Sequence, residues 1–399
     1  MATVTFQQAR EIVEREVCAA RRPLRTEVVS LAEAAGRVLA EAVAADRDYP
    51  PFDRATRDGY AVRAADTPGA LRISGQVRAG QEFAPSLRPG EAIEIMTGAP
   101  APPGADAVGM YEHSRREGEK VSFERALRSG ENFVPRGSEA AGGSVPLEPG
   151  QRVDYPEAAL LASFGKQHVT VYCRPRVAIL STGDEVVEIS QPPLRCQIRN
   201  SNAHSLAAQV RRAGGEPLLL PIAPDEPVRT LELIEGGLEA DLLLLSGGVS
   251  MGKYDLVEKV LEELGARIYF DGVSMQPGKP LVFGRAGEKF FFGLPGNPLS
   301  TMVTFEVFAR AAVELVGGAA RAPLRFLHAR LGTDFRHRAG LTRFLPAALS
   351  GAGAETVVNP VKWQGSGDVV SLTRANAFLV ASADQSEWKA GDWIPVLPR

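Results

Sequence analysis

The chain has 399 residues, 44% of them hydrophobic, and a formal net charge of −3 at pH 7. At roughly 150 residues per domain, this length predicts two to four domains, each able to bury a core of its own. The near-neutral charge and the lack of a long Lys/Arg block argue against nucleic acid as the main partner. No apolar stretch reaches the ~20 residues that are needed to cross a membrane, so no membrane contact is expected.

Cysteine usage and the start of the chain predict a cytoplasmic protein. The three cysteines, Cys18, Cys173 and Cys196, are too few for a disulfide framework and lack the spacing of a metal site. Residues 1–6 lack the basic region and apolar core of a signal peptide. The five histidines form no close pair in the sequence, so zinc is not expected.

Helical patterns open the chain and then give way to β structure. Residues 5–17 predict an amphipathic helix with Thr5 as its N-cap, and a second helical pattern covers residues 31–43. From 48 to 149, frequent Pro and Gly separate short apolar pieces, which is typical of a small, mostly β segment. Residues 157–164 then predict one short helix.

Residues 171–316 alternate between strand and helix patterns. Apolar runs that predict buried strands lie at 177–180, 218–222, 242–245, 269–270 and 290–292. The helical patterns between them cover 200–213, 256–264 and 297–316, with Asn200 and Asn297 as N-caps. This alternation predicts a largely parallel sheet with helices on both faces.

Strand patterns return after Gly317. They lie at 328–331, 344–349, 356–358, 377–380 and 393–396. Short strands at this spacing predict a small C-terminal barrel or sandwich.

Four glycine-rich loops follow apolar runs in the alternating region. They are Ser-Thr-Gly-Asp-Glu at 181–185, Ser-Gly-Gly-Val-Ser-Met-Gly at 246–252, Met-Gln-Pro-Gly-Lys-Pro at 275–280 and Gly-Leu-Pro-Gly-Asn-Pro at 293–298. In an open α/β sheet, ligands bind in the crevice beyond the carboxyl ends of the strands. Glycines, carboxylates and a lysine at four such ends predict a site for a phosphate-bearing ligand, together with a metal ion.

These loops also have simpler interpretations. Residues 247–253 resemble the start of a nucleotide-hydrolysing loop, but Tyr254 replaces the Ser or Thr that would bind Mg²⁺. The alternative is that the glycines only make a tight turn. The acids at 184–185 fit Mg²⁺ binding and helix capping equally well, and Asp225 and Asp255 are candidates for further acids at the same rim.

Two loops in the β segment complete a family resemblance. They are Pro-Phe-Asp-Arg-Ala-Thr-Arg-Asp-Gly-Tyr-Ala-Val-Arg at 51–63 and Thr-Gly-Ala-Pro at 97–100. Together with the strand-end loops and Asn-Ser-Asn at 200–202, they closely resemble the molybdopterin molybdenumtransferase family, the bacterial relatives of the gephyrin C-terminal domain. The resemblance covers almost the whole chain.

The resemblance implies a multidomain α/β plus β fold. The expected parts are a doubly wound, mostly parallel α/β molybdopterin-binding domain (1–21 and 173–318), a connecting domain (22–48 and 146–172), a β-rich domain (49–145) and a C-terminal β-barrel (319–399). The resemblance also implies an elongated homodimer. Its cleft would lie between the α/β and barrel domains of one subunit and the β-rich domain of the other.

The implied reaction inserts molybdate into adenylylated molybdopterin with Mg²⁺, releases AMP and forms molybdenum cofactor, the last step of cofactor biosynthesis. Such a displacement depends mainly on positioning and charge neutralisation. By resemblance, the residues implied in catalysis are Asp58, Thr97, Glu185, Asp255, Lys279 and Arg343. Those implied in binding the pterin substrate are Ser181, Thr182, Gly183, Asp184, Asp225, Ser246, Gly247, Gly248, Ser250, Pro295, Asn297, Pro298 and Ser366. Those implied in holding Mg²⁺ are Asp184, Glu185, Asp225 and Asp255.

The resemblance also implies partners and leaves alternatives. The expected protein contacts are the molybdopterin adenylyltransferase and recipient molybdoenzymes. One alternative activity is the adenylylation of molybdopterin itself, although that step usually belongs to a single-domain chain. The other is a non-catalytic molybdopterin-binding scaffold, in which Asp58 or Asp255 would be dispensable.

The chain departs from the family pattern at two positions. Gln276 stands where some members have Lys, which removes a positive charge near the proposed anion site. Arg57 stands where Met is familiar, and we expect it to replace part of the lost charge. Arg136 is a further candidate site residue in the β-rich domain.

Overall fold

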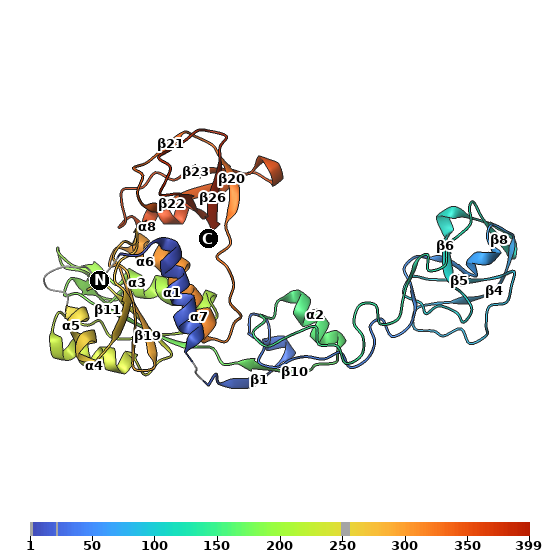
Figure 1. The fold of residues 1–399 in the computed structure, drawn as a ribbon, viewed down its shortest axis with the longest axis horizontal. Helices are drawn as coiled ribbons and strands as arrows, with labels where there is room; N and C mark the ends of the chain where they lie inside the picture. The colour runs from blue at the N-terminus through green and yellow to red at the C-terminus, as the bar shows by residue number, and fades with distance from the viewer. Residues whose placement is uncertain (1–2, 21–22, 249–255) are drawn as a thin grey trace.

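The computed structural model describes residues 3–20, 23–248 and 256–399. The molecule is elongated, with an α/β sheet and a C-terminal lobe at one end and a β-rich lobe at the other (Figure 1). A thin arm joins the two ends, and the chain runs through this arm twice. Within the described parts of the chain, no helix is both long and apolar enough to cross a membrane.

The two passes of the arm pair with each other. Strand β1 (Thr26–Ser30) runs antiparallel to β10 (His168–Tyr172). The short helix α2 (Tyr155–Ser163) begins at a capping box in which Asp154 and Glu157 satisfy backbone N–H groups of the first turn. The predicted short helix is therefore present, and it begins two residues earlier than expected.

The helix predicted over residues 31–43 is wrong. Only Leu31–Glu33 form a 3-10 turn, and none of the residues that follow in this segment is helical. Leu39 is fully buried and forms a β-bridge to Val171 on the returning pass of the arm. The apolar residues therefore pack between two passes of the chain, and this tertiary arrangement overrides the local helical periodicity.

The β-rich lobe is a six-stranded sheet with apolar clusters on both faces. In spatial order its strands are β6 (Ala107–Met110), β3 (Gly59–Val62), β5 (Glu91–Ile95), β4 (Leu71–Val77), β8 (Lys120–Phe123) and β7 (Ser114–Glu117), and a separate pair is formed by β2 (Arg54–Ala55) and β9 (Phe133–Val134). Along β3, Tyr60 and Val62 enter one cluster and Ala61 enters the other, as the two-residue period of a strand requires.

The α/β sheet has the strand order β14-β11-β15-β19-β18-β16. Its strands are β11 (Arg176–Ser181), β14 (Glu216–Leu219), β15 (Leu242–Ser246), β16 (Arg267–Phe270), β18 (Val282–Ala286) and β19 (Lys289–Leu294). The first four in spatial order are parallel, whereas β18 is antiparallel to both of its neighbours. The strand predicted at 218–222 lies earlier in the chain, since β14 ends at Leu219.

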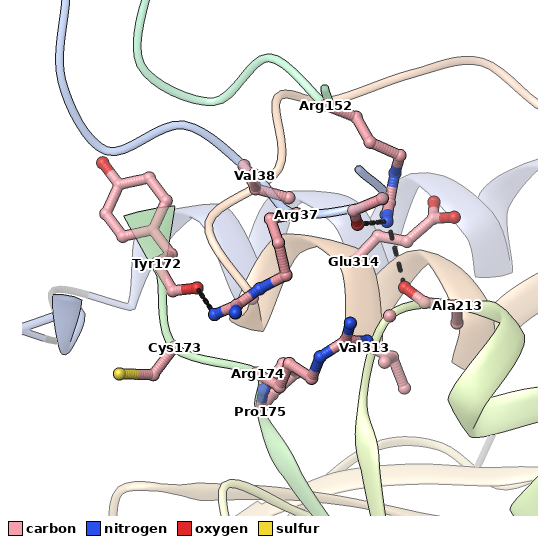
Figure 2. Close-up of a pocket in the computed structure, with 13 residues that line it drawn as sticks. Arg37, Val38, Arg152, Tyr172, Cys173, Arg174, Pro175, Ala213, Val313 and Glu314 are labelled. Carbon is pink, nitrogen blue, oxygen red and sulfur yellow. Dashed lines mark hydrogen bonds between the residues drawn. The ribbon is translucent and has the colours of Figure 1, made fainter. Parts of the chain in front are cut away.

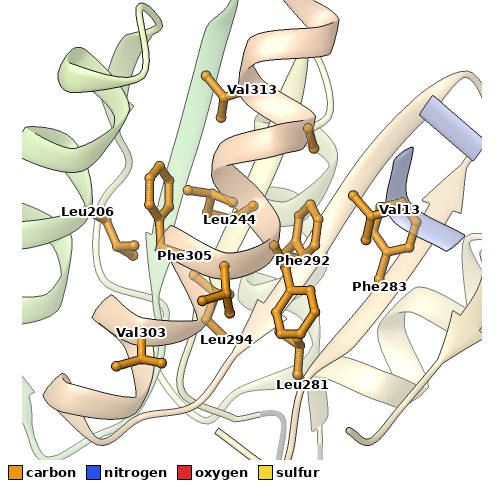
Figure 3. Close-up of a cluster of buried hydrophobic side chains, with 14 of the residues drawn as sticks. Val13, Leu206, Leu244, Leu281, Phe283, Phe292, Leu294, Val303, Phe305 and Val313 are labelled. Atoms are coloured by element: carbon orange, nitrogen blue, oxygen red, sulfur yellow. The ribbon is translucent and has the colours of Figure 1, made fainter. Parts of the chain in front are cut away.

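Helices cover both faces of this sheet. On one face are α1 (Phe6–Ala19), α3 (Ser201–Arg212), α6 (Pro298–Thr304) and α7 (Arg310–Val316), and on the other are α4 (Pro227–Gly237) and α5 (Leu256–Glu263). Leu244 and Phe292 from the sheet share one buried cluster with Phe305 from the helical layer (Figure 3). The predicted doubly wound, mostly parallel α/β fold is confirmed.

Two of the predicted helix caps are present. The Thr5 hydroxyl accepts a hydrogen bond from Gln8 N (3.2 Å), and Asn200 Oδ1 accepts one from Ala203 N (3.1 Å). The third expected cap differs, because Asn297 precedes α6 without making a side-chain capping bond. A π-helical turn, η4 (Phe305–Ala309), interrupts the α-helical segment between α6 and α7.

The C-terminal lobe contains a closed barrel. Its strands are β22 (Thr342–Ser350), β23 (Val357–Pro360), β20 (Leu327–Leu331), β26 (Trp393–Pro398) and β24 (Ala377–Ala381), and β24 pairs back with β22. Because the sheet closes on itself, the C-terminal domain is a barrel and not the alternative sandwich. The remaining short elements are β12 (Val186–Val187), β13 (Ile198–Arg199), β17 (Met275–Gln276), β21 (Phe335–Arg336), β25 (Glu387–Trp388) and α8 (Val369–Arg374).

Candidate functional site at the strand ends

The four glycine-rich loops lie at one edge of the α/β sheet. Strands β11, β15 and β19 are parallel neighbours, so their carboxyl ends share that edge. Strand β18 is antiparallel and therefore starts there, directly after the loop at 275–280. This is the crevice in which open α/β sheets bind ligands.

The loop after β11 is joined to both neighbouring strands. Thr182 N donates to Ser246 O at 3.1 Å, which links it to the end of β15. Gly183 N donates to Ala223 O at 3.2 Å, and Asp225 N donates to Asp184 Oδ1 at 3.0 Å. The structure therefore brings together the predicted residues of the first loop, the end of β15 and the rim acid at 225.

Glycines 247 and 248 are required by close approach as well as by turn geometry. Both have positive φ, +94° and +61°. A Cβ at Gly247 would lie 2.8 Å from Thr182 O, and one at Gly248 would lie 2.7 Å from Thr182 Oγ1. Their small size thus lets the β11 and β15 loops pack against each other. The predicted site residues Ser250 and Asp255 lie outside the described residues.

The loop between β19 and α6 completes this wall of the site. Gly247 N donates to Leu294 O at 3.3 Å, and an ideal Cβ at Gly296 would lie 3.7 Å from the Gly247 Cα. Thr301 Oγ1, in the first turns of α6, donates to the carbonyls of Pro295 and Asn297. The first turn of α6, which begins at Pro298, therefore holds the loop before it against the glycines that follow β15.

Two asparagines connect these loops: Asn200, which was predicted only as a helix cap, and Asn202, to which the sequence reasoning gave no individual role. Asn200 is buried, and its Oδ1 accepts from Ser181 Oγ at 2.9 Å. Asn202 Nδ2 donates to Ser246 Oγ at 2.9 Å and to Gly296 O at 2.7 Å. The motif Asn-Ser-Asn was visible in the sequence, but its bonding partners are 44 and 94 residues away for Asn202 and cannot be deduced from spacing.

The loop at 275–280 reaches the barrel. Strand β17 pairs in parallel with β22, and Gln276 is the register partner of Arg343. Arg343 Nε is buried and has no hydrogen-bond partner among the described residues. The Lys279 side chain is exposed, and its carbonyl accepts from Val273 N at 2.9 Å. The departure at 276 and the predicted cation at 343 are thus adjacent.

Gly278 fixes the shape of this loop. Its φ is +102°, and a Cβ there would lie 2.4 Å from Thr304 Cγ2 on α6. The barrel also touches this helix, since Ser366 O accepts from Leu299 N at 2.9 Å. Lys279, Arg343 and Ser366 are therefore all tied to the elements around the strand ends.

Asp58 and Thr97 are paired with each other in the distant β-rich lobe. Asp58 Oδ1 accepts from Thr97 N at 2.6 Å and from Thr97 Oγ1 at 2.7 Å. The backbone hydrogen bond, with help from the hydroxyl, lowers the pKa of the Asp58 carboxyl below its ordinary value. Figure 1 shows that the strands flanking these residues lie at the opposite end of the molecule from the α/β sheet. One chain alone does not bring them to the strand-end loops.

Arg136 lies in the same lobe and is engaged there. Its Nε donates to Asp48 Oδ2 and its backbone N donates to Asp53 Oδ1, both at 2.7 Å. Asp48 has a lowered pKa, mainly because it accepts from Gly142 N and also because of Arg136. Arg57, in contrast, is exposed, and it directly precedes Asp58 in the sequence.

Mg²⁺ fits the acids of the strand ends only as an ion shared with a substrate. Across the residues that the structure describes, no three His, Cys, Asp or Glu side chains are grouped as a metal site. Glu185 folds back over Gly183, with its carboxylate 2.4 Å from where a Cβ would stand. Mg²⁺ commonly takes one or two carboxylates and completes its shell with substrate phosphates and water, a requirement that Asp184 and Asp225 can meet.

A separate small hollow lies at the other edge of the sheet. Arg152 lines it and donates to Gly36 O at 2.8 Å and to Ala213 O at 3.3 Å, while Arg37 donates to Tyr172 O at 3.0 Å (Figure 2). The bond from Arg152 to Ala213 joins the arm to the segment before β14, and the other two bonds lie within the arm. The hollow is therefore a structural joint, far from the glycine-rich loops.

Three family models match the chain. They are the MoeA N-terminal region (domains I and II) at residues 4–165, a probable molybdopterin binding domain at 178–314, and the MoeA C-terminal region (domain IV) at 328–398. The matched regions take in the arm with the β-rich lobe, the α/β sheet and the barrel. This architecture is that of one class of multidomain protein, built around an α/β domain of molybdopterin-binding type.

Curated relatives match most of the chain. The chain is 35% identical to the molybdopterin molybdenumtransferase of Bacillus subtilis over 395 residues, which covers 96% of this chain and 92% of the relative. It is 39% identical to the enzyme of the same name from Nostoc over 307 residues, covering 74% and 70%. A crystal structure of the molybdopterin biosynthesis MoeA protein from Pyrococcus horikoshii superposes with a TM-score of 0.81 at 29% identity, covering 100% of both chains. The chain belongs to the molybdopterin molybdenumtransferase family.

Proposed function

We propose that this protein inserts molybdenum from molybdate into adenylylated molybdopterin and releases AMP. The observation that carries the proposal is the set of joined glycine-rich loops, within a chain that matches relatives of that activity from end to end. Adenylylation of molybdopterin is the weaker alternative, because it leaves the arm, the β-rich lobe and the barrel without a task. A pure scaffold would not need the acids and cations gathered at the strand ends.

The chemistry asks mainly for positioning and neutralisation of negative charge. Backbone N–H groups around Gly247 and Gly248 suit the phosphates of the substrate. Lys279 and Arg343 supply positive charge from the side of the barrel, where Ser366 also lies. Ser181, Thr182 and Ser246 would orient the pterin substrate by hydrogen bonds.

Asp184, Glu185, Asp225 and Asp255 are our candidates for holding Mg²⁺ together with the substrate. When bound, the ion would offset charge on the phosphate oxygens. The protein's own contribution is the rim geometry, in which the backbone of Asp225 fixes one oxygen of Asp184.

A homodimer would complete the site. Asp58 and Thr97 are remote from the strand ends within one chain, and a second copy could bring its β-rich lobe to them. The pre-oriented, readily ionised Asp58 carboxylate supports a role in that cleft. We further propose a cytoplasmic location and the division 1–21 with 173–318, 22–48 with 146–172, 49–145, and 319–399.

The direct test is AMP release from adenylylated molybdopterin by the purified chain with Mg²⁺, with and without molybdate. We expect molybdate-dependent release, and a product that activates an apo-molybdoenzyme. Tight binding of the substrate without any AMP release would contradict the proposal and favour a scaffold.

A further inference from the structure

We infer that Asn202 is a positioning residue, which sets the spacing between the loop after β15 and the loop after β19. The inference rests on the proposed function for its ligand, but its geometry is independent of that function. Asn202 lies in the first turn of α3, and its side-chain amide donates both to Ser246 Oγ (2.9 Å) and to Gly296 O (2.7 Å). One side chain therefore spans two of the loops that form the proposed phosphate-binding wall.

The orientation of the Asn202 amide is determined by its partners. The Gly296 carbonyl can only accept a hydrogen bond, so the NH₂ group of the amide must face it. Asn202 Oδ1 is buried and has no partner within the described residues. The donor side alone thus holds the side chain in place, and loss of the NH₂ group removes both links at once.

Together with the neighbouring Asn200, Asn202 links α3 to three of the four parallel strand ends, those of β11, β15 and β19. Asn200 Oδ1 accepts from Ser181 Oγ, at the end of β11, and from Ala203 N, which it caps. Asn202 reaches the ends of β15 and β19. Of the two, Asn200 also stabilises the helix itself, whereas the side-chain bonds of Asn202 go only to the loops.

The spacing set by Asn202 matters because the two loops touch through glycines. An ideal Cβ at Gly296 would lie 3.7 Å from the Gly247 Cα, so the backbones are already close to contact. Without the amide, the direct link between the two segments is the long hydrogen bond from Gly247 N to Leu294 O (3.3 Å), so their spacing would be less well fixed for binding one phosphate. Binding of the adenylylated pterin would then weaken more than the chemical step.

The test compares Asn202→Ala and Asn202→Asp in the full chain. Asp has nearly the same volume but lacks the NH₂ donor and places a negative oxygen against the Gly296 carbonyl. We expect both variants to raise KM for adenylylated molybdopterin about tenfold or more, the equivalent of two ordinary hydrogen bonds. The kcat value should change less. If Asn202 only fills space, Asn202→Asp would keep the wild-type KM, and that result would overturn the inference.

Asn376→Ala is the matched control. Asn376 also makes two side-chain hydrogen bonds, to the N–H and carbonyl of Leu349, but within the barrel. It should lower stability to a similar degree and leave KM unchanged. A KM increase equal to that of Asn202→Ala would mean that general destabilisation explains both, against the inference.

Hydrogen exchange on the protein without substrate separates this inference from the proposed function. Asn202→Ala should speed exchange at residues 246–248 and 296–297, with the α3 amides beyond Ala203 unaffected. This readout needs no activity, so it stands even where wild-type protein releases no AMP. Unchanged exchange at both loops would refute the positioning role.

Discussion

The Arg10 guanidinium donates a 2.8 Å hydrogen bond to the carbonyl of Val307, inside the π-helical turn between α6 and α7. A π turn shifts the helical hydrogen bonds and leaves carbonyls without their usual partners. Arg10 also pairs with the buried Glu14 at 2.9 Å. The N-terminal helix therefore satisfies a defect in the helix that starts beneath the proposed site.

Replacing Arg10 with Met should destabilise the α/β domain by about 1–2 kcal/mol, since it removes the donor to the Val307 carbonyl and one of two arginine partners of the buried Glu14. The second partner, Arg321, stays 2.6 Å from the Glu14 carboxylate. Thermal unfolding, followed by calorimetry, should shift down by several degrees. Arg15→Met is the control, because Arg15 is exposed and pairs with the neighbouring Glu16. Equal melting temperatures for the two variants would show that the Val307 contact contributes little.

Gly278→Ala should displace the loop that carries Lys279. The positive φ and the 2.4 Å approach to Thr304 Cγ2 both oppose a Cβ at this position. We expect AMP release to fall at least tenfold, and Thr304→Ser in the same chain to restore part of it by removing the clashing methyl group. Gly287→Ala is the control, because Gly287 has positive φ but no atom within 4 Å of its Cβ position. No difference between the two alanine variants would contradict the steric argument.

Thr97→Val should raise the pKa of Asp58, since it removes the hydroxyl donor and keeps the backbone donor. The pKa of Asp58 is lower in the folded protein than in the unfolded chain, where it is about 4. The stabilisation from this pair is therefore complete above the unfolded-state pKa and is lost as the pH falls through the folded-state pKa. In Thr97→Val that loss should move to higher pH. Carboxyl NMR titration checks it, and Thr97→Ser, which keeps the hydroxyl, should titrate like wild type.

Two inactive variants should complement each other when the site is built from two copies. Co-expression of Asp58→Ala with Lys279→Ala would give mixed dimers in which one of the two sites has both residues intact. Random pairing predicts about a quarter of the wild-type rate of AMP release. Activity no higher than that of either variant alone would argue for a site within one chain.

We expect Arg57 to replace part of the positive charge that is missing at Gln276, so Arg57→Ala should raise KM for molybdate. The effect should shrink at high salt, because dissolved ions screen the attraction between the exposed Arg57 side chain and the molybdate anion. Arg115→Ala serves as control, since Arg115 is an exposed residue of the same lobe and pairs with Glu117. An unchanged molybdate dependence in Arg57→Ala would remove this hypothesis.

Features governed by local rules followed well from the sequence. Thr5 and Asn200 cap their helices, and the apolar runs that end in Ser181, Ser246 and Leu294 are buried parallel strands. Parallel strands with glycine-rich ends place those loops at one edge, so the location of the candidate site could be predicted as well.

Features governed by distant contacts did not follow. The apolar residues at 34–43 look helical, and only the returning pass of the arm explains their burial. The role of Asn202 depends on Ser246 and Gly296, and the pairing of Gln276 with Arg343 depends on how the barrel docks. Family resemblance supplied the names of site residues but none of these links.

The contact between Arg10 and Val307 also has a consequence for synthesis. The turn that receives helix α1 is made 297 residues after the residue that contacts it. At the usual speed of translation this interval lasts roughly 15–60 s. During that time the apolar face formed by Phe6, Val13 and Val17 has no sheet to cover it, while the β-rich lobe is already complete and free to fold. Helix α1 is therefore synthesised well before the elements on which it packs, and it can reach its native position only after they have formed.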